Sequence, residues 1–341
     1  MPIIHRTGSR PVMKFAAILA CFSAQGMAAK TEVPVFLFSG QSNMVGLGTS
    51  TNDLTADQKK TYADIKIYLD AEGDAAKMKK WSTLGPGFGG SSSQFGPELF
   101  FGKVLADSFP GRKMAFIKVA RSGTYLGKVA EWLPPSSNNG TGGTYYKAMM
   151  VSIDDAMKSF NSAFDTTQYT PKWSGFLWLQ GEFDAMDATL SNQYETNLTN
   201  LLKDIRTKAG VTDLPVILPM IDVQSTWTNN AKIRAADIAL TKKLTRVDTV
   251  DTKGLPTDNI HYKAAGMITI GTRCAARFLT MKSLSAIDLA YRPQPTFSAS
   301  DAPRFDLVGR RIGGQNVAHG VSGFLTIEGG KIKLSHSAPV R

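Results

Sequence analysis

The chain is poor in cysteine and histidine and has no long apolar run. Its 341 residues include two cysteines and four histidines. If Cys21 is removed with a leader, Cys274 is left without a disulfide partner. So few thiols indicate no cysteine-based metal site, and we expect neither a metal nor a cofactor. Because no apolar run reaches about 20 residues, we also expect no membrane-spanning helix.

Acidic residues are outnumbered by basic ones, and the formal net charge is +11. The basic residues are dispersed along the chain rather than gathered in a run. Such dispersal favours solubility and weak attraction to acidic polymers over a nucleic-acid surface. We therefore expect no nucleic-acid partner.

Residues 1–29 have the pattern of a leader. A basic start at Met13-Lys14 precedes the apolar stretch 15–22, and small residues follow at 26–29. This order is typical of a signal peptide, so we expect a bacterial protein that is secreted or on the cell surface. The alternatives are a short buried helix and, because ILAC at 18–21 resembles a lipoprotein signal, a lipid-anchored protein.

Short apolar runs alternate with helical patterns through residues 30–290. We expect strands at 34–39, 114–120, 174–179 and 214–220, and helices at 97–108, 145–160, 190–208, 229–244 and 263–282. This alternation predicts an α/β domain whose parallel sheet is covered by helices on both faces. Ligands of such sheets bind beyond the carboxyl ends of the strands. Two loops rich in glycine and serine, 83–96 and 133–144, are long enough to border a site or be disordered.

Residues 291–341 differ from the rest in composition. RPQP at 292–295 is typical of a linker, and short alternating strands follow, with a Gly329-Gly330 hairpin signal. About 45 residues cannot build a large core. We therefore expect three parts: a leader (1–29), a main domain (30–290) and a small all-β C-terminal appendage with its linker (291–341).

Ser42 is the candidate nucleophile. The strand at 34–39 runs into GQSNM at 40–44, which places a hydroxyl above the sheet near helix N–H groups. That placement suits a nucleophile with its oxyanion donors. The G-x-S-x-G elbow is absent because residue 44 is methionine. The alternative is that Ser42 only caps a helix.

His261 is the only histidine in residues 30–290. A serine nucleophile needs a base to accept its proton, and the base needs a carboxylate to fix its tautomer. Asp258 stands three residues before His261, within reach in a turn. The alternative is that Asp258 or Asn259 caps the following helix.

Three further residues follow expected strands. Gly123 can present its N–H to an oxyanion or simply form a tight turn. Gln180 can donate a hydrogen bond to the same oxyanion. Glu182 is an orienting carboxylate or a surface acid.

The segments GQSNM (40–44), QGEFD (180–184) and DNIH (258–261) occur in this order after the expected strands. Together they resemble the SGNH hydrolase superfamily, and within it carbohydrate esterase family 6 and its sialate O-acetylesterase-like relatives. The resemblance covers residues 33–282. It implies a three-layer, flavodoxin-like α/β/α fold and ester hydrolysis through an acyl-enzyme.

The resemblance also implies a role for each motif residue. Ser42 is the nucleophile, His261 the base and Asp258 the residue that orients it. The oxyanion hole is formed by the N–H groups of Ser42 and Gly123 and the side chain of Gln180. The supporting residues are Gln41, Asn43 and Glu182, with Glu182 also an alternative acid partner of the histidine.

Two positions depart from the family pattern. Leu179 stands where the family often has histidine, and RSGT at 121–124 has one glycine where two are expected. Neither departure removes a member of the triad.

The substrate implied is an acetylated polysaccharide, with acetyl groups on plant cell-wall xylan. Trp132, Tyr125 and Trp81 lie near the expected loops and are candidates to stack on sugar rings, although Trp81 fits core packing equally. The alternatives are a sialate O-acetylesterase, a short-chain ester hydrolase and a non-catalytic carbohydrate-binding protein on a hydrolase scaffold. The segments FDLVGRR (305–311) and GFLTI (323–327) resemble the tail of a type IX secretion sorting domain. This resemblance implies secretion machinery as a partner; the alternative is a structural or carbohydrate-accessory unit.

Overall fold

The computed structural model describes residues 29–281 and the backbone of four short strands further on. The expected leader and the linker at 292–295 lie outside the described residues. The four later strands pair antiparallel in a separate sheet. They are β8 (Arg304–Phe305), β9 (Arg311–Ile312), β10 (Gly323–Glu328) and β11 (Lys331–His336).

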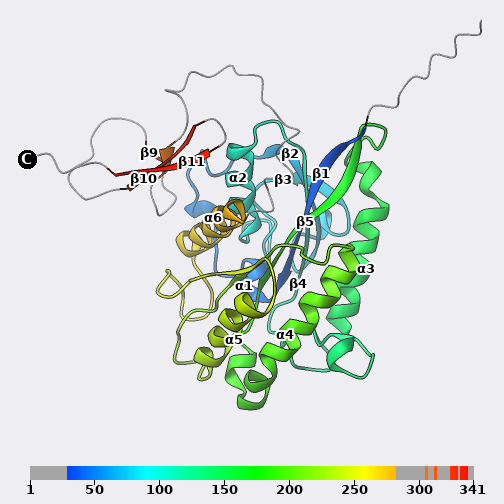
Figure 1. The fold of residues 1–341 in the computed structure, drawn as a ribbon, viewed down its shortest axis with the longest axis vertical. Coiled ribbons are helices and arrows are strands. Elements are labelled where there is room, and N and C mark those ends of the chain that lie inside the picture. Colours follow the sequence, from blue (N-terminus) through cyan, green and yellow to red (C-terminus); the bar gives the residue numbers. More distant parts are fainter. Residues whose placement is uncertain (1–28, 282–303, 306–310, 313–322, 329–330, 337–341) are drawn as a thin grey trace, which may run out of the picture.

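A seven-stranded sheet forms the centre of the main domain (Figure 1). Its order is β3-β2-β4-β1-β5-β6-β7, and only β3 runs antiparallel to its neighbour. The strands are β1 (Thr31–Gly40), β2 (Tyr62–Ala71), β3 (Trp81–Leu84), β4 (Met114–Ala120), β5 (Tyr169–Leu179), β6 (Val216–Pro219) and β7 (Val247–Val250). The four expected strands are confirmed, and β2, β3 and β7 are additional.

Helices cover both faces of the sheet, which confirms the expected three-layer α/β fold. Successive side chains of β1 point to opposite faces: Val35 and Leu37 pack with α3, α4 and α5, whereas Phe36 and Phe38 pack with α2 and α6. The helices are α2 (Glu98–Ser108), α3 (Thr144–Lys158), α4 (Ala188–Ala209), α5 (Asn230–Lys243) and α6 (Ala264–Thr280). No helix among the described residues is long and apolar enough to cross a bilayer.

The three central strands end at the same level. Gly40 of β1 pairs with Ala120 of β4 on one side and with Leu179 of β5 on the other. The chain goes from β1 to β2, β3 and β4 on one side of β1 and then crosses to β5, β6 and β7 on its other side, so this is the switch point where α/β proteins bind ligands. The residues that follow Gly40, Ala120 and Leu179 therefore meet at one edge.

Both glycine- and serine-rich loops are ordered parts of the fold. Loop 85–97 is mostly buried and is joined to the turn after β1, since Thr49 Oγ1 accepts from the Phe95 N–H at 2.9 Å. Loop 133–144 packs on α4 through hydrogen bonds from Ser136 to Asp204 and from Asn200 to Ser137. The first loop thus borders the switch point, and the second braces a helix.

Candidate active site

The turn that carries Ser42 depends on a glycine. Gly40 has a φ of +148°, and a Cβ there would lie 2.0 Å from the carbonyl oxygen of Leu179 on the neighbouring strand. Only glycine allows this close approach. The chain then enters α1 (Ser42–Val45), a helix of four residues. Ser42 is thereby held at the carboxyl edge of the sheet, with 4% of its surface exposed.

Ser42 does not cap this helix. Gln41 occupies the N-cap position, and no side chain caps the helix by a hydrogen bond. The Ser42 hydroxyl makes no hydrogen bond with any residue that the structure describes. Its backbone N–H belongs to the first turn, where no intrahelical acceptor exists. Both groups are therefore free to act on a ligand.

Asp258 and His261 lie in a tight turn after β7, bracketed by a bridge between Thr257 and Tyr262. Asp258 Oδ1 accepts hydrogen bonds from the N–H groups of Ile260 at 3.0 Å and His261 at 2.7 Å. Its Oδ2 lies 3.9 Å from His261 Nδ1. The N-cap position of α6 belongs to Lys263, so neither Asp258 nor Asn259 caps that helix. Asp258 instead shapes the turn and faces the imidazole.

The surroundings of His261 favour its neutral form. Burial lowers the pKa of the imidazole, and the negative charge of Asp258 partly opposes that shift. For Asp258, burial acts to raise the pKa, but the N–H groups of His261 and Ile260 outweigh it and hold the pKa below its usual range. A neutral imidazole beside an ionised carboxylate is what a general base requires.

Asn43 joins the serine turn to the histidine turn. Its Oδ1 accepts a hydrogen bond from the Tyr262 N–H at 3.1 Å, and its Nδ2 donates to Glu182 at 2.6 Å. The segment after α1 also packs on the histidine turn, since a Cβ on Gly48 would lie 2.6 Å from the Cβ of His261. The turn of Ser42 and the turn of His261 are thus linked through the Asn43 side chain.

Glu182 supports the serine turn through two hydrogen bonds. This buried carboxylate accepts hydrogen bonds from Gln41 and Asn43, the two neighbours of Ser42. Burial raises its pKa, while those hydrogen bonds oppose the shift. Among the described residues, Glu182 forms no hydrogen bond or ion pair with His261, and Asp258 is the carboxylate beside the histidine.

Gly123 stands in an exposed turn after β4, with a φ of +67°. Within residues 29–281 its N–H has no acceptor. Gln180 differs, because its amide group donates to the Thr124 carbonyl at 3.0 Å and to Asp184 at 2.7 Å. In this arrangement Gln180 holds the turn and presents no free donor; its direct role in the oxyanion hole stays a prediction.

Asp184 organises the loop after Gly123, a role that its place in the sequence did not suggest. Its carboxylate accepts from the N–H groups of Leu126 at 2.8 Å and Gly127 at 2.9 Å, and from Gln180. Burial raises its pKa to about 6, against those hydrogen bonds. The motif at 180–184 contains Asp184, but only the fold shows which loop it holds.

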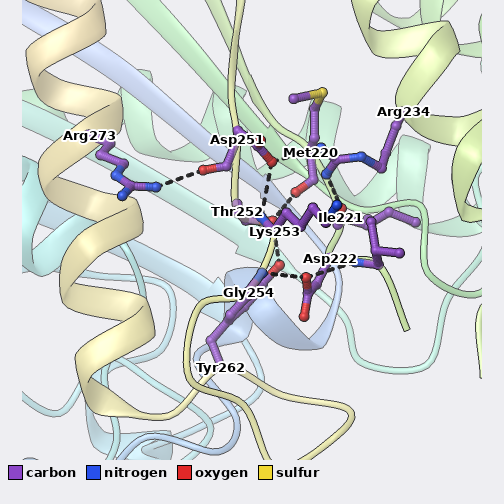
Figure 2. Close-up of polar contacts among 11 residues, drawn as sticks. Met220, Ile221, Asp222, Arg234, Asp251, Thr252, Lys253, Gly254, Tyr262 and Arg273 are labelled. Atoms are coloured by element: carbon purple, nitrogen blue, oxygen red, sulfur yellow. Dashed lines mark hydrogen bonds and ion pairs between the residues drawn. The ribbon is translucent and has the colours of Figure 1, made fainter. Parts of the chain in front are cut away.

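A second network holds the histidine turn from the side of β6 and β7 (Figure 2). Tyr262 donates from its hydroxyl to Thr252 at 2.7 Å, and Thr252 in turn donates to the Met220 carbonyl. The buried carboxylate of Asp222 accepts from the Gly254 N–H at 2.9 Å. The residue after His261 is therefore fixed at its backbone by Asn43 and at its hydroxyl by Thr252.

The aromatic predictions need correction. Trp132 is fully buried, packs against Trp178 and donates to Thr124, so it is a core residue and does not stack on a sugar. Trp81 also packs in the core, donating to the Ala156 carbonyl. Tyr125 is half-buried beside Phe183, whose ring would lie 3.8 Å from a Cβ added at Gly123. Only Tyr125 remains a candidate for substrate contact.

Within the described residues, no three histidine, cysteine, aspartate or glutamate side chains are grouped as metal ligands.

Comparisons with known proteins place the chain in a family. The sequence profile of the family described as "Carbohydrate esterase, sialic acid-specific acetylesterase" matches residues 32–280. A probable carbohydrate esterase of Arabidopsis thaliana is 24% identical over 255 residues, covering 72% of this chain and 90% of that protein.

Three solved structures show the same fold. An Arabidopsis thaliana protein has a TM-score of 0.57 at 23% identity, covering 72% of this chain and 97% of that one. NanS has a TM-score of 0.54 at 15% identity, covering 74% and 98%. A carbohydrate acetylesterase from Xanthomonas citri has a TM-score of 0.50 at 18% identity, covering 72% and 56%. Since the family profile spans most of the chain, this protein belongs to the carbohydrate esterase family of sialic acid-specific acetylesterases.

Proposed function

We propose that this protein is an SGNH-type O-acetylesterase that removes acetyl groups from plant cell-wall polysaccharide, with acetylxylan as substrate. The observation that supports this most is the bridge through Asn43, which sets the free hydroxyl of Ser42 beside the turn of His261. The family supplies the coarser part, an esterase acting on acetylated carbohydrate.

The proposed reaction has two halves. Ser42 Oγ attacks the acetyl carbonyl carbon while His261 accepts its proton, and the N–H groups of Ser42 and Gly123 stabilise the oxyanion. The ester bond then breaks, and the sugar oxygen leaves with the proton from His261. Water then gives a proton to His261 and attacks the acetyl carbon on Ser42. The bond from Ser42 Oγ to the acetyl group breaks, acetate leaves, and His261 returns the proton to Ser42 Oγ. Asp258 stabilises the imidazolium in both halves.

A sialate O-acetylesterase is the second candidate, and the description of the family favours it. The chemistry at Ser42 is the same for both sugars, so the residues around Ser42 that contact the sugar decide between them. Short-chain ester hydrolysis and non-catalytic carbohydrate binding are the remaining alternatives.

The same proposal includes export. The leader pattern at 1–29 supports a protein that is secreted or held on a bacterial surface. In this proposal, secretion machinery recognises the tail at 291–341. The test of export is to express the protein with and without its tail in a bacterium that has type IX secretion. The mass and the location of the two proteins are then compared. Retention inside the cell with the tail present would contradict the proposal.

The test of the activity is acetate release from acetylated xylan and from O-acetylated sialic acid, with Ser42→Ala and His261→Ala measured beside the wild type. We expect release from xylan by the wild type alone. Release only from sialic acid would move the substrate to the second candidate. Substantial activity in either variant would rule out the triad, and a wild type inert on both sugars and on an aryl acetate would favour a binding role.

A further inference from the structure

Lys118 and Glu98 form an ion pair that the proposed mechanism does not use. Both side chains are fully buried, and Lys118 Nζ lies 2.8 Å from Glu98 Oε2. Lys118 belongs to β4 and Glu98 begins α2. Two charges are costly to bury, and an apolar pair of similar volume is often at least as stable. A contribution to the stability of the fold is therefore a weak explanation for the presence of this buried ion pair.

The ammonium group of Lys118 has two further acceptors. It donates to the carbonyl of Val45 at 3.1 Å and to the carbonyl of Phe88 at 2.7 Å. All three of its N–H donors are thus used. Val45 is the last residue of the helix that Ser42 begins, and Phe88 lies in loop 85–97.

Glu98 and the loop complete the arrangement. Glu98 Oε1 accepts from the Gly96 N–H at 3.1 Å. A Cβ on Gly96 would lie 2.4 Å from Glu98 Oε2, 2.5 Å from Lys118 Nζ and 2.7 Å from the Met44 carbonyl oxygen. The loop backbone is therefore packed between the ion pair and the helix of the nucleophile, with no room for a side chain.

Helix α1 has only one turn, so it depends on its surroundings for a fixed position. At its start, Gly40 packs against Leu179. At its end, the Val45 carbonyl has no partner within the helix, and a cation there is favourable. Lys118 supplies that cation from the strand that leads, five residues later, to Gly123.

We propose that Lys118, held by Glu98, is a positioning residue for the nucleophile: it fixes the end of α1 and thereby keeps Ser42 aligned with the oxyanion donors. This inference rests on the proposed serine esterase function. Lys118 touches no reacting atom; it acts through Val45 and through β4, the strand that precedes the Gly123 turn.

The test compares two variants with a matched control. The double variant Glu98→Leu with Lys118→Met removes both charges and leaves no unpaired ion. Gly96→Ala keeps both charges but displaces them. Leu105→Ala removes a buried side chain two turns along α2 from Glu98 and controls for lost stability. Each folded protein is assayed for kcat and KM on an aryl acetate, for the rate at which an organophosphonate modifies Ser42, and for thermal midpoint.

We expect kcat of the double variant to fall about 100-fold, as for a reacting group displaced by about 1 Å, with KM changed less than about threefold. The rate of Ser42 modification should fall by a similar factor, whereas Leu105→Ala keeps kcat within about twofold despite a lower midpoint. Gly96→Ala should lose at least about tenfold in kcat, and it decides the question if the double variant does not fold.

A folded double variant with kcat within about threefold of the wild type would overturn the positioning role and leave the esterase function standing. Equal losses in Leu105→Ala would also overturn it, because lost stability would then account for the effect. A wild type that neither cleaves the ester nor reacts with the organophosphonate would overturn the esterase function, and this role with it.

Discussion

Asn43 contributes both an acceptor and a donor to the proposed site. Replacing it by alanine leaves the Tyr262 N–H and one oxygen of Glu182 without their partner. We expect Asn43→Ala to lower the free energy of unfolding by about 1–3 kcal/mol and kcat by about 10- to 100-fold, measured by urea unfolding and steady-state kinetics. Asn200→Ala, which removes a contact to Ser137 beside α4, should leave kcat unchanged. Wild-type turnover in Asn43→Ala would contradict this role.

The pH dependence of activity should report on His261. The base must be neutral, and burial lowers its pKa from the ordinary 6.5, so kcat/KM should fall only as the pH drops below that value. Asp258 acts to raise this pKa, so Asp258→Asn should move the acid limb further down. It should also lower kcat, by up to about 10⁴-fold, through loss of the correct tautomer. An acid limb that moves upward in Asp258→Asn would show that another group titrates.

Asp184 should make stability depend on pH. Its pKa is about 6 in the folded protein and 3.8 ordinarily. The folded state therefore binds the proton more tightly, and the stabilisation present below pH 3.8 is lost as the pH rises through 6, by about 3 kcal/mol. Relative to Asp184→Asn, the wild type should lose unfolding free energy between pH 4.5 and 7, measured by urea titration. A difference between the two proteins that is the same at both pH values would contradict the shift.

Among the helices and strands, the sequence predicted those with a strong pattern of apolar residues. The four apolar strands and the five long helices are present within a few residues of the expected bounds. β2 was missed because charged residues interrupt it, among them Asp70, which is buried with Arg121 as its ion partner. β3 and β7 have only four residues each, too short for a periodic signal.

In the candidate site, the residues that follow strong strands were predictable from the sequence, whereas the contacts between distant segments were not. Ser42, Gly123 and Gln180 follow strong strands, so their common edge could be inferred from the alternation of elements. The contacts of Asn43 and Lys118 join segments far apart in the chain, and no local pattern encodes them. Trp132 was misplaced because a tryptophan near a loop has no sequence signal that separates a core position from a surface.

The close approach of β1 to β5 predicts that the end of β1 does not tolerate a side chain at Gly40. Gly40→Ala would place a methyl group against the Leu179 carbonyl, so we expect a loss of more than about 3 kcal/mol in unfolding free energy and the loss of turnover. Gly210→Ala is the matched control, since that glycine also has a positive φ but nothing within 4 Å of a Cβ. It should cost about 1 kcal/mol. Equal losses would show that backbone strain, not contact with β5, is the cause.

For the whole molecule, the main domain should be independent of its tail. Both faces of the sheet are covered by helices that end with α6, and the family match ends at residue 280. We expect a chain that stops at residue 281 to unfold cooperatively at the thermal midpoint of the full-length protein, with kcat within about twofold. Loss of folding on truncation would show that the later strands contribute to the core.

The bridge from Asn43 to Tyr262 spans 219 positions of the chain. During synthesis Ser42 leaves the ribosome early, whereas the turn of His261, its proposed base, is joined to it only after the segment that follows β7 has been made and has docked. Under the proposed mechanism, a partly folded molecule in which this turn has not docked has no esterase activity. The rate at which a reagent modifies Ser42 during refolding would therefore report when the histidine turn docks.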